Sequence, residues 1–269
     1  MRHLVIVRGG GAMATGTIHR LHNVGYEVLV LEKARPSALR REAAFADAVY
    51  DGVKTVERVT CHCAANWHEA DNLLRTGVVT MLVDPSGRYV HRFRPHILVD
   101  SLSDAGDEPA QPLPALYRIG LGPRFCAGPD VDCVIETLRG HNLGRIIYEG
   151  RAARAQKPAS AVGGIERILR APVGGTIESQ HTISSVVRKG DVVAEIYTDR
   201  SEIIEVRSPL DGVLRGTIHD GYIVMPGMPI AEVDPRTEPG DCFTISDRAR
   251  CIAGSVLEAV LAWEKGLHR

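Results

Sequence analysis

The first residues whose types and spacing could do chemistry are glycines near the start of the chain. Gly9, Gly10 and Gly11 follow a short apolar run, and Gly9-x-Gly11-x-x-Ala14 is one accepted form of the dinucleotide-binding turn. Glycines let the backbone approach a phosphate closely, and a helix that begins in the turn offers free amides and a positive dipole end. The spacing therefore predicts a turn that binds a nucleotide phosphate.

Two neighbouring charges fit the same interpretation. Glu32 ends a second apolar run, 23 residues after Gly9, where a carboxylate can accept hydrogen bonds from a ribose. Arg8 favours an anion, although it could equally pair with a structural carboxylate. The alternative is a glycine turn that has lost its ligand. The expected cofactor-binding residues are Arg8, Gly9, Gly10, Gly11, Ala14, Thr15, Gly16 and Glu32.

A second group of residues could meet the anionic parts of a ligand. Residues 130–150 gather Glu136, Arg139, His141 and Arg145 around glycine turns, and arginine and histidine suit phosphate or carboxylate. A salt-bridge network at a domain junction is an equal alternative. The remaining ligand-binding candidates are Arg40, Arg41, Asp100, Asp241 and Cys242.

The cysteines predict no metal site, because no pair has the spacing of a structural zinc site. For Cys242, a reactive thiol and a buried, inert thiol both remain open. No residue is assigned a catalytic role.

Predicted strands alternate with predicted helices in the first part of the chain. This alternation predicts a Rossmann-like, mostly parallel sheet and a nucleotide-binding domain over residues 1–155. The Pro-rich stretch 101–115 is expected to be a mobile cover or a surface connection. The expected strands are 3–7, 26–31, 78–83, 97–100 and 117–121, and the expected helices are 14–23 and 38–49.

Residues 163–237 contain an internal repeat with a constant offset of 37 residues, in which Arg170-Ala-Pro172 aligns with Arg207-Ser-Pro209. The repeat predicts a small all-β domain similar to the barrel-sandwich hybrid of biotinyl and lipoyl domains. No lysine lies between Lys189 and Lys265, so the domain lacks the carrier lysine. We expect it to be a lid, a docking surface or an oligomer contact.

The end of the chain and the composition complete this picture. Residues 240–269 are expected to form a segment and a helix that packs back on the first domain. The formal net charge is -1, so no basic excess favours nucleic acid. No apolar stretch is long enough for a signal peptide or a membrane span, which predicts a cytoplasmic protein without a membrane partner.

Several segments together resemble the YqeB-type family of accessory proteins for selenium-dependent molybdenum hydroxylases. The chain departs from the family pattern at Ala12 and in the residues that follow Val99-Asp100. The matching runs are VIVRGGGAMATG (5–16), RREAAFADAVYDG (40–52), GLGPRFCAGPDVDCVIETLRGHNLGRIIYEG (120–150), the barrel repeat and DCFTISDRARCIAGSVLEAVL (241–261).

The resemblance implies a Rossmann-like domain and a role in maturing or inserting the molybdenum cofactor of a hydroxylase. The implied partner is the molybdenum hydroxylase or its cofactor-maturation machinery. We therefore expect an accessory factor that binds a nucleotide-bearing ligand, namely molybdopterin dinucleotide, ATP or NAD. The alternatives are an NAD(P)-dependent oxidoreductase and a non-catalytic interaction scaffold, and a homo-oligomer is compatible with all three.

Overall fold

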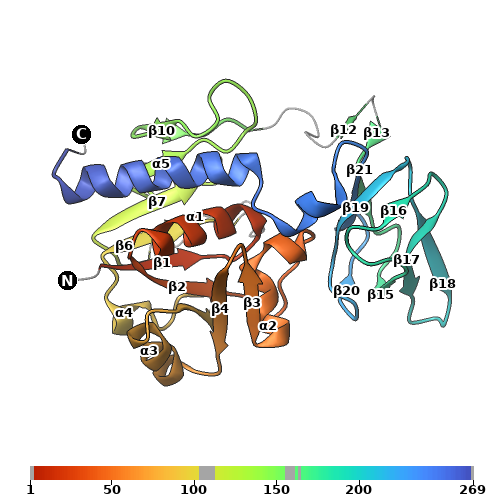
Figure 1. Cartoon of the computed structure of the whole chain (residues 1–269), viewed down its shortest axis with the longest axis horizontal. Helices are drawn as coiled ribbons and strands as arrows, with labels where there is room; N and C mark the ends of the chain where they lie inside the picture. Colours follow the sequence, from red (N-terminus) through yellow and green to blue (C-terminus); the bar gives the residue numbers. More distant parts are fainter. Residues whose placement is uncertain (1–2, 103–112, 155–160, 163–164, 268–269) are drawn as a thin grey trace. The chain divides into compact units, whose positions relative to one another are not determined.

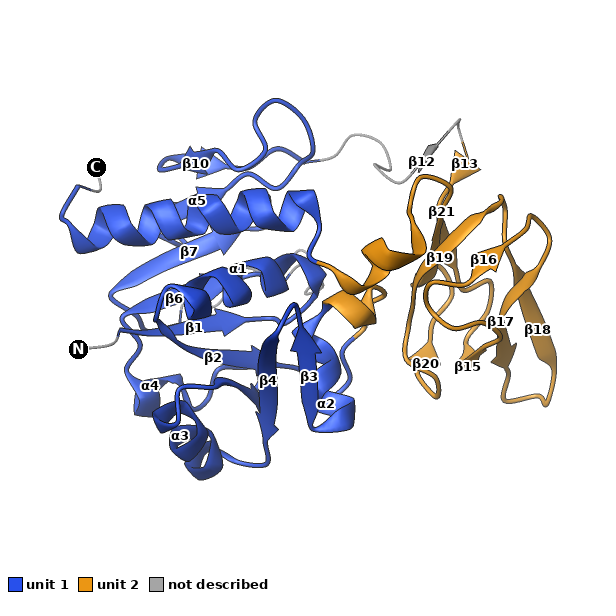
Figure 2. Ribbon diagram, viewed as in Figure 1, with its two compact units in different colours: residues 1–36, 44–155, 245–269 blue, residues 37–43, 156–244 orange. Residues whose placement is uncertain are grey.

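The structure is a computed structural model that describes residues 3–102, 113–154, 161–162 and 165–267 (Figure 1). The chain divides into two compact units (Figure 2). Unit 1 comprises Met1–Pro36, Ala44–Ala155 and Ile245–Arg269, and unit 2 comprises Ser37–Ala43 and Gln156–Thr244.

Unit 1 is built on a nine-stranded mixed sheet in the order β10-β9-β7-β6-β1-β2-β5-β4-β3. The strands from β9 to β4 run parallel, whereas β10 and β3 pair antiparallel at the two edges. A separate antiparallel pair joins β8 to β11. The strand bounds are β1 Leu4–Arg8, β2 Glu27–Glu32, β3 Val53–Val56, β4 Val59–Ala64, β5 Val79–Val83, β6 Ile97–Asp100, β7 Tyr117–Leu121, β8 Cys126–Ala127, β9 Cys133–Ile135, β10 Ile146–Ile147 and β11 Gly150–Arg151.

Helices cover both faces of this sheet. Side chains of β1 alternate between the faces, so Val5 and Val7 pack in the core beneath α1 and α5, while Ile6 packs beneath α3 and α4. The sequence of a strand that is buried on both faces is a continuous run of apolar residues, so β1 and β2 can be recognised from the sequence alone. The helices are α1 Ala12–Asn23, α2 Ala48–Asp51, α3 Trp67–Arg75, α4 Val90–Phe93 and α5 Asp247–Glu264, with a 3₁₀ turn η2 at Phe45–Asp47.

Helices α1 and α5 lie side by side (Figure 1) and approach closely at Gly16. A Cβ atom built on Gly16 would lie 2.7 Å from the carbonyl oxygen of Ala249 in α5. The space for a side chain is therefore taken by backbone of the neighbouring helix. Ser246 caps α5 by accepting a hydrogen bond from the Ala249 amide, which fixes where α5 begins.

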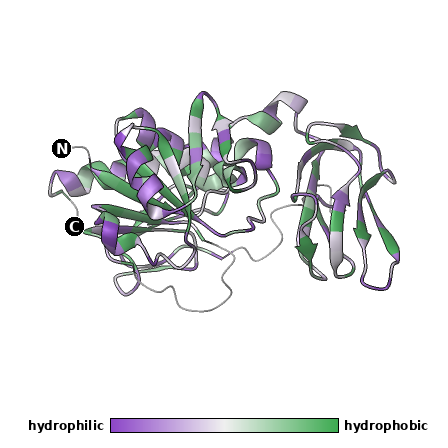
Figure 3. Cartoon of the chain, turned by 90° about the horizontal axis from the view of Figure 1, so that it is seen from below, coloured by the Kyte–Doolittle hydropathy of each residue, from purple (hydrophilic) through white to green (hydrophobic). Residues whose placement is uncertain are grey.

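Unit 2 contains two four-stranded antiparallel sheets, in the orders β14-β21-β19-β16 and β18-β17-β15-β20, and a small pair β12-β13. Its core includes Ile177, Leu214 and Ile230, all fully buried, and the strands of both units are largely hydrophobic (green in Figure 3). The bounds are β12 Ala161–Val162, β13 Ile165–Glu166, β14 Ile168–Arg170, β15 Gly175–Ser179, β16 Val186–Val187, β17 Val192–Tyr197, β18 Ile203–Arg207, β19 Gly212–Thr217, β20 Ile223–Val224 and β21 Pro229–Asp234, with 3₁₀ turns η1 Arg41–Ala43 and η3 Pro239–Phe243.

The expected fold class, a Rossmann-like mostly parallel sheet with a biotinyl/lipoyl-like barrel-sandwich domain, is wrong. The described residues form one mixed sheet and four antiparallel sheets. The hairpin β3–β4 was missed because its turn residues, Glu57 and Arg58, adopt positive φ angles of 46° and 71°. Such turns are recognised by Asn or Gly at these positions, and this turn contains neither.

The expected helix over residues 38–49 is also wrong. Residues 41–47 form short 3₁₀ turns, and the only α-helical part is α2. The segment Ser37–Ala43 belongs to unit 2, where a Cβ on Gly216 of β19 would lie 2.5 Å from the Leu39 carbonyl oxygen. This segment therefore takes its conformation from tertiary packing rather than from helix propensity.

Replacing Gly16 by alanine should destabilise unit 1 by about 1–3 kcal/mol, because the added methyl group meets the Ala249 carbonyl group. Gly11→Ala is the matched control, because no described residue beyond its chain neighbours lies within 4 Å of the added Cβ atom. Urea unfolding followed by circular dichroism measures both changes. Equal stability of the two variants would contradict the close packing of α1 on α5.

Candidate functional site

Four acidic side chains at the carboxyl ends of parallel strands form the most regular polar feature of unit 1. They come directly at or after the ends of β2, β5, β6 and β9, and all four are buried. Each carboxylate accepts hydrogen bonds from backbone amides of its own edge of the sheet. We call Glu32, Asp84, Asp100 and Glu136 the carboxyl-edge acids.

The carboxylate of Glu32 faces the glycine turn. It accepts hydrogen bonds from the Gly10 amide at 2.7 Å and from the Lys33 amide at 2.8 Å. The expectation of a Rossmann nucleotide-binding turn is therefore corrected. The carboxylate that was expected to meet a ribose instead holds a turn amide that was expected to meet a phosphate.

The rest of the turn is tied to the fold. Thr15 donates its hydroxyl to the Gly10 carbonyl oxygen and accepts the Phe45 amide at 3.0 Å. Ala14 is buried, and Gly16 faces α5 rather than the turn. The predicted residues thus lie together at the start of α1, but most of their polar atoms serve the fold.

The other carboxyl-edge acids bind the loops that follow them. Asp84 accepts the amides of Arg88 at 3.0 Å and Tyr89 at 2.8 Å. Glu136 accepts the amides of Leu138 and Ala153, each at 2.7 Å. These contacts satisfy buried charges that would otherwise be costly.

Arg8, at the end of β1, is the cation at the centre of this edge. Its Nη1 atom lies 3.1 Å from Oδ2 of Asp100, and its Nε and Nη2 atoms donate to the Pro85 carbonyl oxygen at 3.0 and 2.7 Å. Arg124 donates to the Leu102 carbonyl oxygen at 3.2 Å. Burial raises the pKa of Asp100, and the charges of Arg8 and Arg124 oppose that rise.

The strand order places this group at a special point of the sheet. From β1 the chain adds β2 and β5 on one side, and it later adds β6, β7 and β9 on the other side. In open α/β sheets, ligands bind outside the carboxyl ends of strands where the order reverses, which here is between β1 and β6. Arg8 and Asp100 are the residues at those two strand ends.

The four candidates between residues 130 and 150 do not form one cluster. Arg139 makes a two-pronged ion pair with Asp247 of α5, with both contacts at 2.8 Å. Glu136 is one of the carboxyl-edge acids and accepts backbone amides. His141 and Arg145 are exposed on the turn between β9 and β10. The structure therefore places Arg139 in a salt bridge with α5, not with Glu136.

The remaining candidates belong to unit 2. Arg40 forms two 2.8 Å contacts with the buried carboxylate of Glu232, and Arg41 donates to the Thr217 carbonyl oxygen. Asp241 takes part in the cap of η3. Cys242 is buried, and that burial raises the pKa of its thiol.

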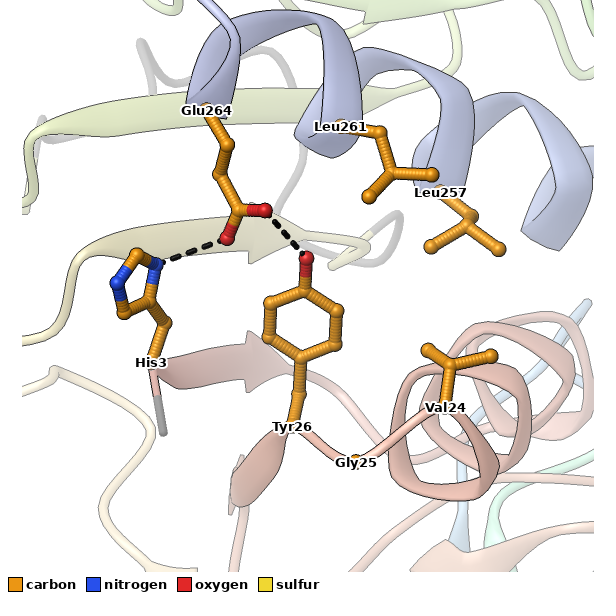
Figure 4. Close-up of a pocket in the computed structure, with 7 residues that line it drawn as sticks. All are labelled: His3, Val24, Gly25, Tyr26, Leu257, Leu261 and Glu264. Atoms are coloured by element: carbon orange, nitrogen blue, oxygen red, sulfur yellow. Dashed lines mark hydrogen bonds and ion pairs between the residues drawn. The ribbon is translucent and has the colours of Figure 1, made fainter. Parts of the chain in front are cut away.

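Sequence reasoning missed a pocket of about 360 Å³ beside the amino ends of β1 and β2 (Figure 4). Glu264 accepts hydrogen bonds from Tyr26 at 2.9 Å and shares one with His3 at 2.8 Å. Burial and Glu264 raise the pKa of Tyr26. His3 and Glu264 are 261 residues apart, so no local motif signals the pocket.

The described residues contain no group of three or more His, Cys, Asp or Glu side chains placed to hold a metal ion. Among the same residues, no helix has the length and apolar character needed to cross a membrane.

The chain resembles one curated protein closely. It is 38% identical over 260 residues to the uncharacterized protein YqeB of Escherichia coli (strain K12). The match covers 96% of this chain and 47% of YqeB, so the chain spans about half the length of its relative. No family model matches. The homology supports placing the chain with YqeB-type proteins.

The solved structures that match are more distant. A succinylglutamate desuccinylase from Silicibacter is 14% identical with a TM-score of 0.28, over 86% of this chain and 84% of that chain. An aspartoacylase family protein from Mesorhizobium loti is 12% identical with a TM-score of 0.30, over the same shares. The expectation of a Rossmann nucleotide-binding protein is corrected by the glycine turn described above, in which Glu32 holds the Gly10 amide.

Acid should weaken unit 2 through Asp234, the last residue of β21. Burial alone would raise its pKa, but hydrogen bonds from Arg236 and the charge of Arg167 lower the pKa from 3.8 to about 2. A lowered pKa contributes stability that is present above the ordinary value and is lost as the pH falls through about 2. The melting temperature of the wild type should fall as the pH is lowered from 3.8 through about 2. The melting temperature of Asp234→Asn should fall less over the same pH range.

A direct titration covers the case in which Asp234→Asn fails to fold. Carbon NMR of the wild-type Asp234 carboxyl group should give a pKa below 3.8. A pKa at or above that value would contradict the ion pairing described for unit 2.

Proposed function

We propose that this chain, a homologue of YqeB, is an accessory factor in the maturation of a selenium-dependent molybdenum hydroxylase. Support comes from the family resemblance of its sequence segments and from the homology to YqeB. The partner is the hydroxylase or its cofactor-maturation machinery. The ligand is an anion that bears phosphate, as the pterin of a molybdenum cofactor does.

The observation that carries this proposal is the Arg8–Asp100 pair at the point where the strand order reverses. An arriving phosphate would compete with Asp100 for the guanidinium group of Arg8, because both are anions that arginine binds through paired hydrogen bonds. The raised pKa of Asp100 helps this exchange, since the carboxyl group then takes up a proton more readily when a second anion approaches.

Two further features support an anion at this position. Arg124 adds a second positive charge near Asp100. No described residue outside the immediate chain neighbours lies within 4 Å of a Cβ atom built on Gly11, which precedes α1, so the described part of the chain leaves space beside the start of this helix. A helix start of this kind favours negative charge. The inward position of Glu32 gives no support to the NAD(P)-dependent alternative, because its carboxylate already holds the Gly10 amide.

The biological role is tested in the host. Deleting the gene should abolish the activity of the molybdenum hydroxylase while leaving its polypeptide present, and expression of the wild-type chain should restore that activity. A deletion strain with a fully active hydroxylase would contradict the accessory role.

The site is tested with Arg8→Ala in protein purified from the host. Native mass spectrometry with molybdenum analysis should show a bound pterin in the wild type and an occupancy lower by about tenfold or more in the variant, because charged hydrogen bonds are lost. Arg75→Ala is the matched control, since Arg75 is exposed on α3 and pairs there with Asp71, one helical turn earlier. Unchanged occupancy in Arg8→Ala would place the ligand elsewhere.

A further inference from the structure

One sheet of unit 2 carries a row of side chains across its four strands, with apolar or aromatic residues on three of them and a threonine on β15. The strands β18, β17, β15 and β20 lie side by side in unit 2 (Figure 2). Strand pairing places Ile203 opposite Tyr197, Tyr197 opposite Thr176, and Thr176 opposite Ile223. Residues directly opposite in neighbouring strands point to the same face of a sheet. We call Ile203, Tyr197, Thr176 and Ile223 the apolar row.

An acidic row runs beside it on the same face. Glu205 pairs with Glu195, and Glu195 pairs with Glu178. Each glutamate is two residues from a member of the apolar row, so it points the same way. The residues between the rows, Ile177 and Ile196, are fully buried and point into the core. We call Glu205, Glu195 and Glu178 the acidic row.

Three members of the apolar row are open to solvent, and Thr176 is partly buried. Ile223 is 58% exposed, Ile203 is 55% exposed and Tyr197 is 39% exposed. Scattered exposed apolar residues are ordinary, but an aligned group on one face marks an interaction surface. Burial of these side chains by a partner would remove the cost of their exposure.

The acidic row opposes the stability of the isolated chain. Like charges directly opposite each other in a sheet are unfavourable. Arg207 pairs with Glu205, and Tyr197 donates a hydrogen bond to Glu195 at 2.9 Å, so two of the three carboxylates have local partners. Glu178 is exposed at the end of the row. The surface therefore keeps a negative strip beside an apolar strip.

We propose that this face is a docking site for an amphipathic helix of a partner protein, with an apolar stripe bordered on one side by lysine or arginine. Four strands spaced by about 4.8 Å make a row about 14 Å long, which matches about nine to ten helical residues. The acidic row lies about 7 Å to one side, within reach of basic side chains on the flank of such a helix.

The docking site stands on unit 2 alone and does not depend on the proposed function. A chain that binds no cofactor could still dock a partner here, and failure of one proposal leaves the other intact.

The test uses the full-length chain and a synthetic helical peptide of about 14 residues, with leucines at i, i+4, i+7 and i+11 and lysines along one side. Isothermal calorimetry should show binding that weakens as salt is added, because the lysines face the acidic row. A peptide with glutamate in place of lysine should bind at least about tenfold more weakly.

Variants locate the binding surface. The double variant Ile203→Ser with Ile223→Ser should weaken binding by about tenfold or more. The matched control is Val186→Ser, since Val186 is 73% exposed but lies on the other four-stranded sheet. The pair Glu178→Gln with Glu205→Gln should weaken binding about threefold or more and reduce its salt dependence, whereas Glu149→Gln in unit 1 should change neither.

Four results would overturn the docking proposal. The first is no binding of the lysine peptide at millimolar concentration, and the second is equal binding of the lysine and glutamate peptides. The third is a loss of binding in the control variants as large as in the double variants. The fourth is a dimer in sedimentation that Ile203→Ser with Ile223→Ser converts to a monomer, which would make this face an interface between copies of the chain.

Discussion

Buried carboxylates at the ends of parallel strands impose the constraint on which unit 1 depends. A charge removed from water must find hydrogen-bond donors, and backbone amides at the strand ends supply them here. Glu32, Asp84, Asp100 and Glu136 each hold amides of the adjoining loops. The acids therefore fix the paths of the loops that surround the carboxyl edge of the sheet.

This constraint decides which groups remain for a ligand. The Glu32 carboxylate accepts the Gly10 amide, so the two groups are paired with each other. In a dinucleotide site the amide would instead face a phosphate and the carboxylate a ribose. Asp100 differs from the other acids because it also faces a cation, Arg8, at the reversal of strand order. An anion could replace Asp100 at that arginine if the Asp100 carboxyl group takes up a proton, because no buried charge is then left unpaired. This exchange is the physical basis of the proposed binding site.

Unit 2 uses buried charge for another purpose. Arg40 and Arg167 both contact Glu232, and Arg167 also contacts Asp234, so the segment around Arg40 is held to the β-strands by charged hydrogen bonds. Removing one partner of such a buried ion pair is strongly destabilising, because the other charge is then left buried and unpaired. The glutamates of the acidic row lie outside this network. Glu205 pairs with Arg207 and Glu195 accepts a hydrogen bond from Tyr197, whereas Glu178 is exposed at the end of the row.

The sequence predicted what depends on local pattern. The strands expected over 97–100 and 117–121 coincide with β6 and β7, because their apolar runs are continuous. It did not predict the β3–β4 hairpin, whose turn at Glu57 and Arg58 lacks glycine and asparagine.

Features built by distant residues were also missed. Nothing local shows that Glu32 turns inward, that residues 37–43 join unit 2, or that Glu264 meets His3. Each of these features depends on which helices and strands pack against each other. That packing cannot be deduced from local patterns in a single sequence. The candidate residues were therefore easier to find than the partners that determine what they do.

The most direct measurement is a carbon NMR titration of the carboxyl groups in the full-length chain, with and without inorganic phosphate. The account predicts a pKa for Asp100 above 3.8, and a resonance of Asp100 that shifts when phosphate is added while those of Glu32, Asp84 and Glu136 stay in place. If phosphate left Asp100 unmoved, or instead shifted Glu32, the Arg8–Asp100 pair would not be the anion site and the account would fail.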